Sequence, residues 1–248
     1  MTGSNRLHPD PTPVEEVDPA DGAGGAGEQA RPRQARAVLT RRAILVAAAD
    51  QFARLGFHGT SLETVLTAAG VTKGSLYFHF GAKLALAEAV ITQMLAGWDT
   101  VTAHVAGLGL DPLRSVLATT DQIVTVIDQD PIARGGARLL NDPALPPIAA
   151  DGLYSTGETE LTRLFVAAAS AGLLRTGLNP ARIARSVQAQ LAGHMAMAER
   201  SPHRGELWDR ITDMWQGTLP AIATPDWLAG WAGSDWARRP HPDPVTLA

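Results

Sequence analysis

The chain has 248 residues, 45% hydrophobic and 19% charged, which is enough apolar material for one large or two small folded domains. The absence of cysteine excludes disulfides, a thiol nucleophile and cysteine-ligated metals. No apolar run approaches the roughly 18 residues that a membrane helix needs, and residues 1–30 lack the features of a secretory signal peptide. We therefore expect a soluble cytoplasmic protein.

The net charge of −4 is unevenly distributed along the chain. Residues 31–85 carry eight Arg and Lys against two acidic residues, whereas the rest of the chain carries 13 basic against 23 acidic residues. A basic section on an acidic body predicts one surface for a polyanion. On charge alone, uneven decoration of the surface explains the same numbers equally well.

Residues 1–30 are rich in Gly, Pro and acidic side chains, which predicts a disordered tail because such a segment buries too little apolar surface to offset its ordering entropy. An arginine-rich stretch then leads into a helix predicted over about 40–55. Ile44 and Phe52 lie on one face of this helix at helical spacing, and Gly56 supplies its stop.

The next two elements have the spacing of a helix-turn-helix. A helix is predicted from an N-cap at Thr60, and Glu63 three residues later completes a capping box. Gly70 ends this helix, and Thr72 can cap a short third helix that ends near His79. A helix, a tight turn with glycine and a second short helix form the DNA-binding motif in which the second helix enters the major groove.

The remainder of the chain predicts further helices and no alternating strand pattern, so the expected fold class is all-α. A turn-rich loop is expected at 141–147, and the proline-punctuated end from Arg239 is expected to be frayed. In chain order, the predicted helices cover about 84–97, 111–128, 130–141, 151–171, 179–199, 205–223 and 225–237.

The short third helix carries the chemistry for DNA. Gly74 and Ser75 are small enough to let its N-terminus enter a groove, and that N-terminus offers free amides and a positive dipole to phosphate. Thr72 and Ser75 can touch base edges. Tyr77 and Phe78 also fit as core aromatics, and the polar residues also fit as ordinary surface groups. Donors suited to phosphate oxygens, which fix register without reading sequence, are Lys73, Tyr77, His79 and Lys83.

Residues 41–91 resemble the DNA-binding region of TetR-family transcriptional repressors. The segments that carry the resemblance are Gly56–Ser61, Ala69–Phe80 (AGVTKGSLYFHF) and Lys83. With the segment DPIARGGARLL at Asp130–Leu140, the chain further resembles the γ-butyrolactone autoregulator receptors of actinomycetes. The family usually has a capping serine just before Lys83; this chain has Ala82 there, which predicts a poorly capped fourth helix.

The resemblance implies a homodimeric repressor that binds a palindromic operator and releases it when a small molecule enters the C-terminal domain. The implied organisation is a disordered tail (1–30), a three-helix helix-turn-helix DNA-binding domain (31–84), a larger helical ligand-binding and dimerisation domain (85–238) and a frayed tail (239–248). The residues that would bind DNA are Arg36, Arg41, Arg42, Thr60, Thr72, Lys73, Gly74, Ser75, Tyr77, His79 and Lys83.

The ligand pocket is expected between the central helices. Apolar walls with a few donors suit an uncharged signal of the γ-butyrolactone, butenolide or furan type. His104 is a further residue that can orient a polar ligand group. The candidate lining residues are Trp98, Val101, Gln122, Ile123, Thr125, Ile127, Leu139, Leu161, Phe165, Gln190 and His194.

The helices predicted over 179–199 and 205–223 are candidates for a four-helix dimer interface, because small residues beside their apolar stripes permit close approach. The alternative is that both helices belong to the core of one subunit. The candidate interface residues are Ile183, Val187, Leu191, Met195, Trp208, Ile211 and Trp215.

Other classes of protein fit the chain less well. It has no G-x-S-x-G, no HExxH and no phosphate-binding glycine loop, so we expect no enzyme activity, no cofactor and no metal. The expected partners are operator DNA, a small-molecule inducer and a second copy of the chain. The alternatives left open are a TetR-like regulator of a drug or biosynthetic intermediate, a repressor homologue that no longer responds to a ligand, and a non-specific DNA-binding protein.

Overall fold

The computed structural model describes residues 25–140, 142–145, 150–198 and 206–245. The chain divides into two compact units, residues 1–40 and 41–248. The described part of the first unit is the beginning of helix α1 (Gly25–Gly59), which starts well before the predicted position near residue 40. Most of the predicted disordered tail, residues 1–24, lies outside the described residues.

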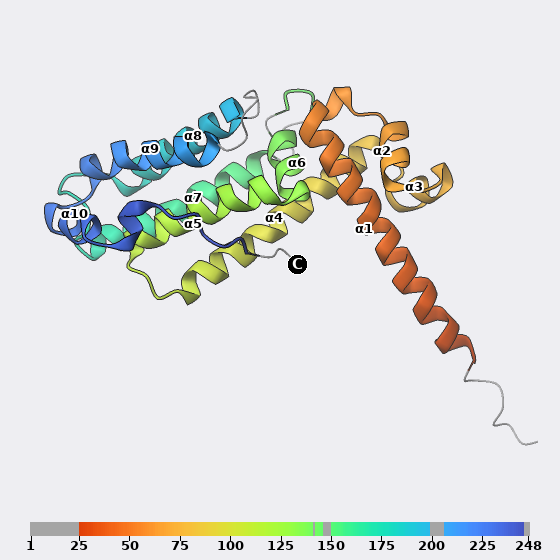
Figure 1. Ribbon diagram of the computed structural model, residues 1–248, viewed down its shortest axis with the longest axis horizontal. Helices are drawn as coiled ribbons and strands as arrows, with labels where there is room; N and C mark the ends of the chain where they lie inside the picture. Colours follow the sequence, from red (N-terminus) through yellow and green to blue (C-terminus); the bar gives the residue numbers. More distant parts are fainter. Residues whose placement is uncertain (1–24, 141, 146–149, 199–205, 246–248) are drawn as a thin grey trace, which may run out of the picture. The chain divides into compact units, whose positions relative to one another are not determined.

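The second unit opens with the rest of α1, followed by α2 (Leu62–Ala69), α3 (Lys73–Phe80) and α4 (Lys83–Gly107) (Figure 1). Gly56 has a φ of 70° and a ψ of −177°, which interrupts α1 where a stop was predicted. Gly70 ends α2 in the left-handed conformation, which glycine adopts without steric cost.

The cap of α2 differs from the prediction. Ser61, not Thr60, is the N-cap: its side chain accepts a hydrogen bond from the Thr64 backbone N–H at 3.1 Å. Thr60 is buried, and its hydroxyl donates to the carbonyl of Gly56 at 2.9 Å. The break at Gly56 leaves that carbonyl available, so Thr60 bonds back to α1 instead of forward to α2, and the predicted capping box with Glu63 does not form.

The helices that follow agree closely with the predicted ranges, apart from α4 and the last one, where the single helix predicted over 225–237 is an α-helix to Ala232 followed by a 3₁₀ turn. Helix α4 continues to Gly107, so Trp98 lies inside it and not after it, and Ala82 provides no side-chain cap, as expected. Among the described residues the only strand-like feature is an isolated bridge between Leu174 and Ala223, which agrees with an all-α fold. The further helices are α5 (Pro112–Gln129), α6 (Pro131–Leu140), α7 (Ala150–Ser170), α8 (Pro180–Ala198), α9 (Glu206–Ile222), α10 (Pro225–Ala232) and the short 3₁₀ helix η2 (Asp235–Arg238).

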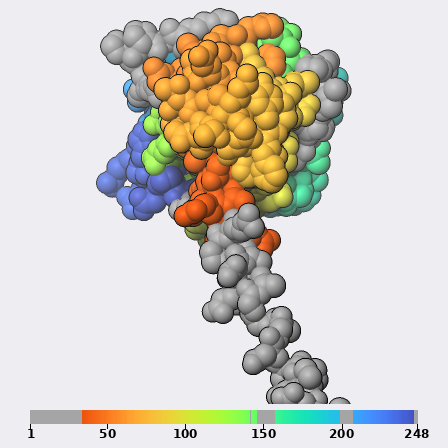
Figure 2. Space-filling view, turned by 90° about the vertical axis from the view of Figure 1, so that its right-hand side faces the viewer, coloured from red at the N-terminus to blue at the C-terminus, as the bar shows by residue number. Residues whose placement is uncertain are grey.

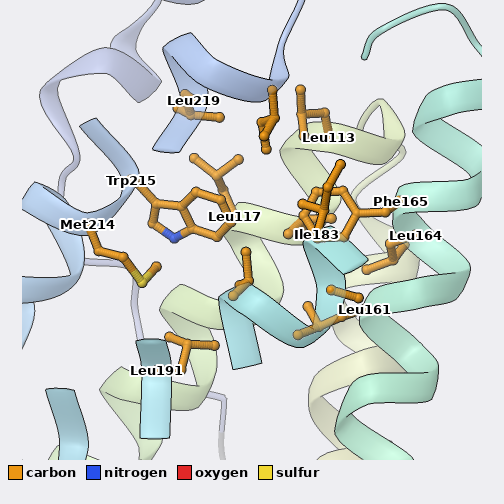
Figure 3. Close-up of a cluster of buried hydrophobic side chains, with 14 of the residues drawn as sticks. Leu113, Leu117, Leu161, Leu164, Phe165, Ile183, Leu191, Met214, Trp215 and Leu219 are labelled. Atoms are coloured by element: carbon orange, nitrogen blue, oxygen red, sulfur yellow. The ribbon is translucent and has the colours of Figure 1, made fainter. Parts of the chain in front are cut away.

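Helices α5, α7, α8 and α9 surround one apolar core. Figure 3 shows Trp215 of α9 beside Leu117 of α5, with Phe165 of α7 in the same cluster. The indole of Trp215 is fully buried, and its Nε1–H donates to Thr120 Oγ1 at 3.1 Å. This bond joins α9 to α5 inside the core.

A second core joins the helix-turn-helix to α4 and α6, and two glycines make it possible. A Cβ on Gly135 would lie 2.4 Å from the carbonyl oxygen of Ala49, and one on Gly136 would lie 2.7 Å from the Met94 sulfur. Helix α6 can therefore pack closely against α1 and α4 only because these residues have no side chain. Buried members of this core include Ile44, Phe52, Val65, Leu76, Phe80, Met94 and Leu139.

The chain after η2 is not frayed over its described part, which corrects the prediction. Arg239 is 6% exposed and pairs with the buried carboxylate of Asp121 on α5. The prolines on which the prediction rested prevent a helix in residues 239–245. The segment nevertheless contacts α5 and α9 through side chains and backbone groups. None of the described helices is both long and apolar enough to span a bilayer.

Candidate DNA-binding surface and ligand cavity

Helix α3 is held by a side-chain cap and two buried residues. Thr72 Oγ1 accepts a hydrogen bond from the Ser75 N–H at 3.3 Å, while Leu76 and Phe80 are buried. The opposite face is open: Tyr77 is 46% exposed and Phe78 is 81% exposed. Figure 2 looks onto the face where α2, α3 and the start of α4 lie at the surface. Helix α3 therefore presents one exposed face while the other is fixed in the core.

Basic side chains surround this helix and rest on aromatic rings. Lys73 Nζ lies 5.9 Å from the ring centre of Tyr77, and Lys83 Nζ lies 4.5 Å from that of Phe57. The Arg41 guanidinium lies 5.0 Å from the ring of Phe80. Such contacts restrict long side chains. Lys83 Nζ also donates to the carbonyl of His58 at 3.5 Å, and its remaining N–H donors suit phosphate.

Most of the residues predicted to bind DNA are accessible. On α3, Lys73, Gly74 and Tyr77 are exposed, and Ser75 and His79 are half-buried. Arg41 and Arg42 on α1 are exposed, Lys83 is half-buried, and Arg36 is exposed in the first unit.

One predicted role changes and one open alternative is decided. Thr60 is 2% exposed, so its side chain is not available at the surface, and Phe78 is not a core residue. Ser61, which the sequence reasoning missed, is exposed at the start of α2, where free backbone N–H groups suit a phosphate. The Ser61–Thr64 spacing was a signal for this cap, but Thr60 and Glu63 offered a competing pair.

An apolar cavity of about 120 Å³ lies between α4, α5, α6, α7 and α8. Gly157 on α7 makes room for a polar group in its wall, because a Cβ there would lie 3.2 Å from Gln188 Oε1. Glu160 is tied to Arg163 at 2.6 Å. The lining residues are Met94, Trp98, Asp99, Val101, Thr102, Thr119, Thr120, Ile123, Ile127, Ala137, Leu140, Gly157, Glu160, Leu161, Gln188, Leu191, Ala192 and Met195.

The structure brings together five of the predicted lining residues, and these are Trp98, Val101, Ile123, Ile127 and Leu161. Leu139 and Phe165 belong to the two cores instead, and Gln190 bonds to Ser186 on its own helix. Thr125 and His194 each bury a polar atom without a hydrogen-bond partner, outside the cavity wall. His104 is exposed near the end of α4.

Gln122 faces the C-terminal residues on the side of α5 away from the cavity, where it bonds to Asp243 and Val245. The cavity is faced instead by Thr119, Thr120 and Ile123. Apolar periodicity correctly predicted that α5 forms a wall of the cavity, but it predicted the wrong polar residues, Gln122 and Thr125, to face the cavity. The reason is that polar side chains lie on both faces of this helix.

The two arginines of α6 point away from the cavity. Arg134 donates to the carbonyls of Ile127 and Asp128, and Arg138 donates to that of Ala53 on α1 at 3.4 Å. Asp142 accepts a hydrogen bond from the Phe57 N–H at 2.6 Å. The end of α1 is thus bonded to α6 and the residues after it, and α6 also lines the cavity through Ala137 and Leu140.

The residues predicted for a dimer interface lie in the core of one subunit, which corrects that prediction. Val187, Ile211 and Trp215 are fully buried. The periodicity identified the buried stripe correctly, but the partner of that stripe is the same chain and not a second copy. The other predicted interface residues also face the inside of the subunit. Ile183, Leu191 and Trp208 are buried, and Met195 lines the cavity.

A helix-turn-helix joined to a helical domain with an apolar cavity is the arrangement of a transcriptional regulator. Residues 44–90 match the family model for bacterial regulatory proteins of the tetR family. The chain is 30% identical over 199 residues to the A-factor receptor protein of Streptomyces griseus, which covers 79% of this chain and 68% of that protein. The chain therefore belongs to the TetR family, and it is a regulator, not an enzyme.

Two solved structures extend the similarity over most of the chain. A γ-butyrolactone receptor (ArpA-like protein) is 25% identical, with a TM-score of 0.70 over 82% of this chain and 97% of that one. CprB from Streptomyces coelicolor, in complex with its biological operator sequence, is 26% identical, with a TM-score of 0.73 over 84% and 99%. These findings confirm the predicted all-helical fold with an N-terminal helix-turn-helix and a C-terminal helical domain.

Proposed function

We propose that the protein is a ligand-responsive repressor that binds a palindromic operator as a dimer in the cytoplasm and leaves it when a small, mostly apolar signalling molecule fills the cavity. The observation that carries this proposal is the continuity of α4, which begins directly after the recognition helix and lines the cavity with Trp98 and Val101. One rigid helix thus connects the DNA-binding surface with the ligand site.

On the DNA side, α3 enters the major groove. Lys73, Tyr77 and His79 bind phosphate oxygens, assisted by Lys83, while Gly74 and Ser75 lie against base edges. The arginines of α1 add phosphate contacts. Phosphate neutralisation makes such binding strongly salt-dependent, so the operator affinity falls steeply as ionic strength rises.

A second copy of the chain docks on the outward faces of α8 and α9. The inward faces are occupied by the subunit core, but Gly193 on α8 and Gly217 on α9 have open space where a Cβ would lie. Ala189 is exposed one turn before Gly193. Small exposed residues at this spacing allow two helices to approach closely.

Release follows from a change in the spacing of the two recognition helices. Successive major grooves require them to lie about 34–36 Å apart. A ligand that binds more tightly to a dimer with a different spacing draws the population away from the DNA-bound state. A ligand with equal affinity for both states releases nothing.

The ligand is an uncharged lactone, butenolide or furan with one or two polar groups. The walls of the cavity are mostly aliphatic and aromatic, and Thr119 and Gln188 offer hydrogen bonds. Both α6 arginines point away, so no cation faces the cavity from that helix. A ligand with a γ-butyrolactone ring fits this chemistry, and the A-factor receptor protein and the ArpA-like receptor are relatives of the chain.

A different ligand class, such as a drug or biosynthetic intermediate, is favoured by two carboxylates in the lining. Asp99 and Glu160 both border the cavity, and carboxylates prefer a ligand that carries donors or a positive charge. Asp99→Asn distinguishes the two classes. It leaves the response to a neutral lactone unchanged and abolishes the response to a cationic ligand.

The test is a gel mobility shift with the DNA that flanks the protein's own gene, repeated with extract of the producing culture. A retarded band that competes with the same palindrome but not with random DNA, and that extract abolishes, supports the proposal. Equal affinity for random DNA indicates a non-specific DNA-binding protein. A specific band that no extract or lactone releases indicates a repressor without ligand response.

A further inference from the structure

The chain after η2 folds back onto α5. This C-terminal segment, residues 239–245, is the dark blue end of the described chain in Figure 1. It begins with Arg239, whose φ of 50° turns the backbone and whose side chain is buried. Two guanidinium nitrogens of Arg239 donate to the two carboxylate oxygens of Asp121, at 2.6 and 2.5 Å.

A second anchor holds the backbone of the segment and not its side chains. The Gln122 amide nitrogen donates to the carbonyl of Asp243 at 3.0 Å, and its amide oxygen accepts from the Val245 N–H at 3.3 Å. This pair of bonds fixes the register of the segment along α5, because a shift by one residue would break both.

The third anchor lies on α9. The Arg239 guanidinium is 5.2 Å from the ring centre of Trp208, and the His241 ring stacks on the same indole at 4.0 Å. The segment therefore contacts α5 and α9 together. These two helices are also joined inside the core by the bond from Trp215 to Thr120.

The anchored residues of α5 are direct neighbours of residues that line the ligand cavity. Asp121 and Gln122 face the segment, whereas Thr119, Thr120 and Ile123 face the cavity. The same turn of helix thus carries both contacts on opposite sides. A displacement of this turn toward the segment would enlarge the cavity, and a displacement away from it would close the cavity.

The contact between segment and α5 is made at a few points and is not continuously packed. A hollow of about 200 Å³ remains between them, bordered by Ala118, Trp236 and Pro240. Burial also raises the pKa of Asp121 to about 6, which shows that the cost of removing this carboxylate from water exceeds the attraction of Arg239. Because desolvation offsets the attraction between the two charges, a buried ion pair of this kind is weak evidence for stability.

We propose that Arg239 and the C-terminal segment are a positioning element of the ligand site: by anchoring Asp121 and Gln122 from behind, the docked segment holds the α5 wall in the place where the cavity accepts a ligand. Docking of the segment and occupation of the cavity therefore favour each other. This inference rests on the proposed function, since it needs the cavity to be a ligand site.

The test uses the full-length protein and 2-naphthol, an uncharged aromatic fluorophore, as the cavity probe. Because the chain has no cysteine, Asp243→Cys introduces one labelling site at an exposed residue that contributes only its backbone carbonyl to the anchor. A bimane on this cysteine is quenched by nearby tryptophan when the segment is docked and brightens when it leaves. Ile123→Trp fills the cavity, so a loss of 2-naphthol binding in this variant shows that the probe binds in the cavity.

Two variants remove separate anchors. Arg239→Met removes the ion pair with Asp121. Gln122→Met removes the two hydrogen bonds to the backbone of Asp243 and Val245 and leaves no charge unpaired, so the Gln122 variant is expected to fold even if the Arg239 variant does not. Both are expected to brighten the bimane and to weaken 2-naphthol binding about fivefold, while saturating 2-naphthol raises docking of the wild-type segment by the same factor. Arg238→Met is the matched control, because Arg238 is exposed and its ion pair within the described residues is with Asp235, and it changes neither reading.

A purely structural role gives a different result. If Gln122→Met releases the segment and 2-naphthol binds with unchanged affinity, the inference is overturned while the ligand site stands. If wild-type protein does not bind 2-naphthol, or binds it equally well with the cavity filled, the ligand site and this inference fail together. Operator binding, measured in parallel without a probe, separates either result from a loss of DNA binding.

Discussion

The side chain of Phe78 is unusually exposed for an aromatic residue. It is the most exposed of the large apolar side chains in the described part of the chain, at 81%, and it lies on the helix that carries the donors proposed to bind phosphate. In the major groove an apolar ring can contact the C5-methyl group of thymine. Its neighbour Gly74, one turn earlier, leaves open space for the approach of a base pair.

We predict that Phe78 contacts a thymine methyl group in each half-operator. Replacing that thymine by deoxyuridine removes one methyl and should weaken wild-type binding by about 0.8 kcal/mol, roughly fourfold. Phe78→Ala should bind both operators equally in fluorescence anisotropy. Other thymines of the site serve as controls, and persistent sensitivity of the variant at the same position would contradict the contact.

Asp121 predicts an unusual pH dependence of stability. Its pKa is raised by burial from 3.8 to about 6, so the folded state holds this proton more tightly than the unfolded state does. By linkage, its contribution to the free energy of unfolding increases as the pH falls from about 6 to about 4, and it is constant above that range.

The measurement is urea denaturation of wild type and Asp121→Asn at several pH values. The difference in unfolding free energy, wild type minus variant, should grow as the pH is lowered through 6. A difference that shrinks instead would mean that Arg239 stabilises the ionised carboxylate more than burial penalises it.

At the level of elements, α6 connects α1 with the wall of the cavity. Its close contact with α1 depends on Gly135, where a Cβ would meet the backbone of Ala49. Arg138 and Asp142 then bond to the end of α1 near Gly56 and Phe57. The same helix therefore contacts both the end of α1 and the cavity.

We predict that Gly135→Ala destabilises the protein by about 1–3 kcal/mol, because backbone atoms cannot move aside as a flexible side chain would. Gly230 on α10 is the matched control: it is also helical but has open space, so Gly230→Ala should be neutral or stabilising by roughly 0.5–1 kcal/mol. Chemical denaturation followed by circular dichroism measures both. Equal effects would show that helix propensity, and not the close approach, decides the outcome.

For the whole molecule, the proposed function requires two copies. The buried stripes of α8 and α9 hold each subunit together, and the outward faces with Gly193 and Gly217 are free in the single chain. We predict that Gly193→Arg prevents dimerisation in sedimentation velocity while the circular dichroism spectrum stays helical. Operator affinity should then fall by about tenfold or more, because one recognition helix reads only half of the site. A dimer of unchanged stability would place the interface elsewhere.

The position of Trp98 on α4 gives a further prediction. Trp98 lines the cavity in the middle of this helix, far along the chain from the recognition helix. Trp98→Ala should alter the inducer concentration needed for release more than it alters operator affinity, since it removes a contact that distinguishes the two states. Equal losses in a mobility-shift titration with and without inducer would contradict this role.

The local signals of the chain determined the helices and the DNA-binding motif. Asp111 and Thr72 cap the helices predicted for them, and Gly56 and Gly70 interrupt the chain where expected. These features depend on backbone conformation and on side chains a few residues apart, which the sequence displays directly. The same holds for the apolar stripes, which correctly identified buried faces.

Only the tertiary structure decided what those faces pack against. A stripe such as that of Val187 has the same pattern whether its partner is the same chain or a second copy, because periodicity records burial and not the neighbour. The withdrawal of Thr60, the exposure of Phe78 and the docking of Arg239 on Asp121 depend in the same way on contacts between distant segments. Those contacts arise from the packing of whole helices, so the composition of any one segment does not reveal them.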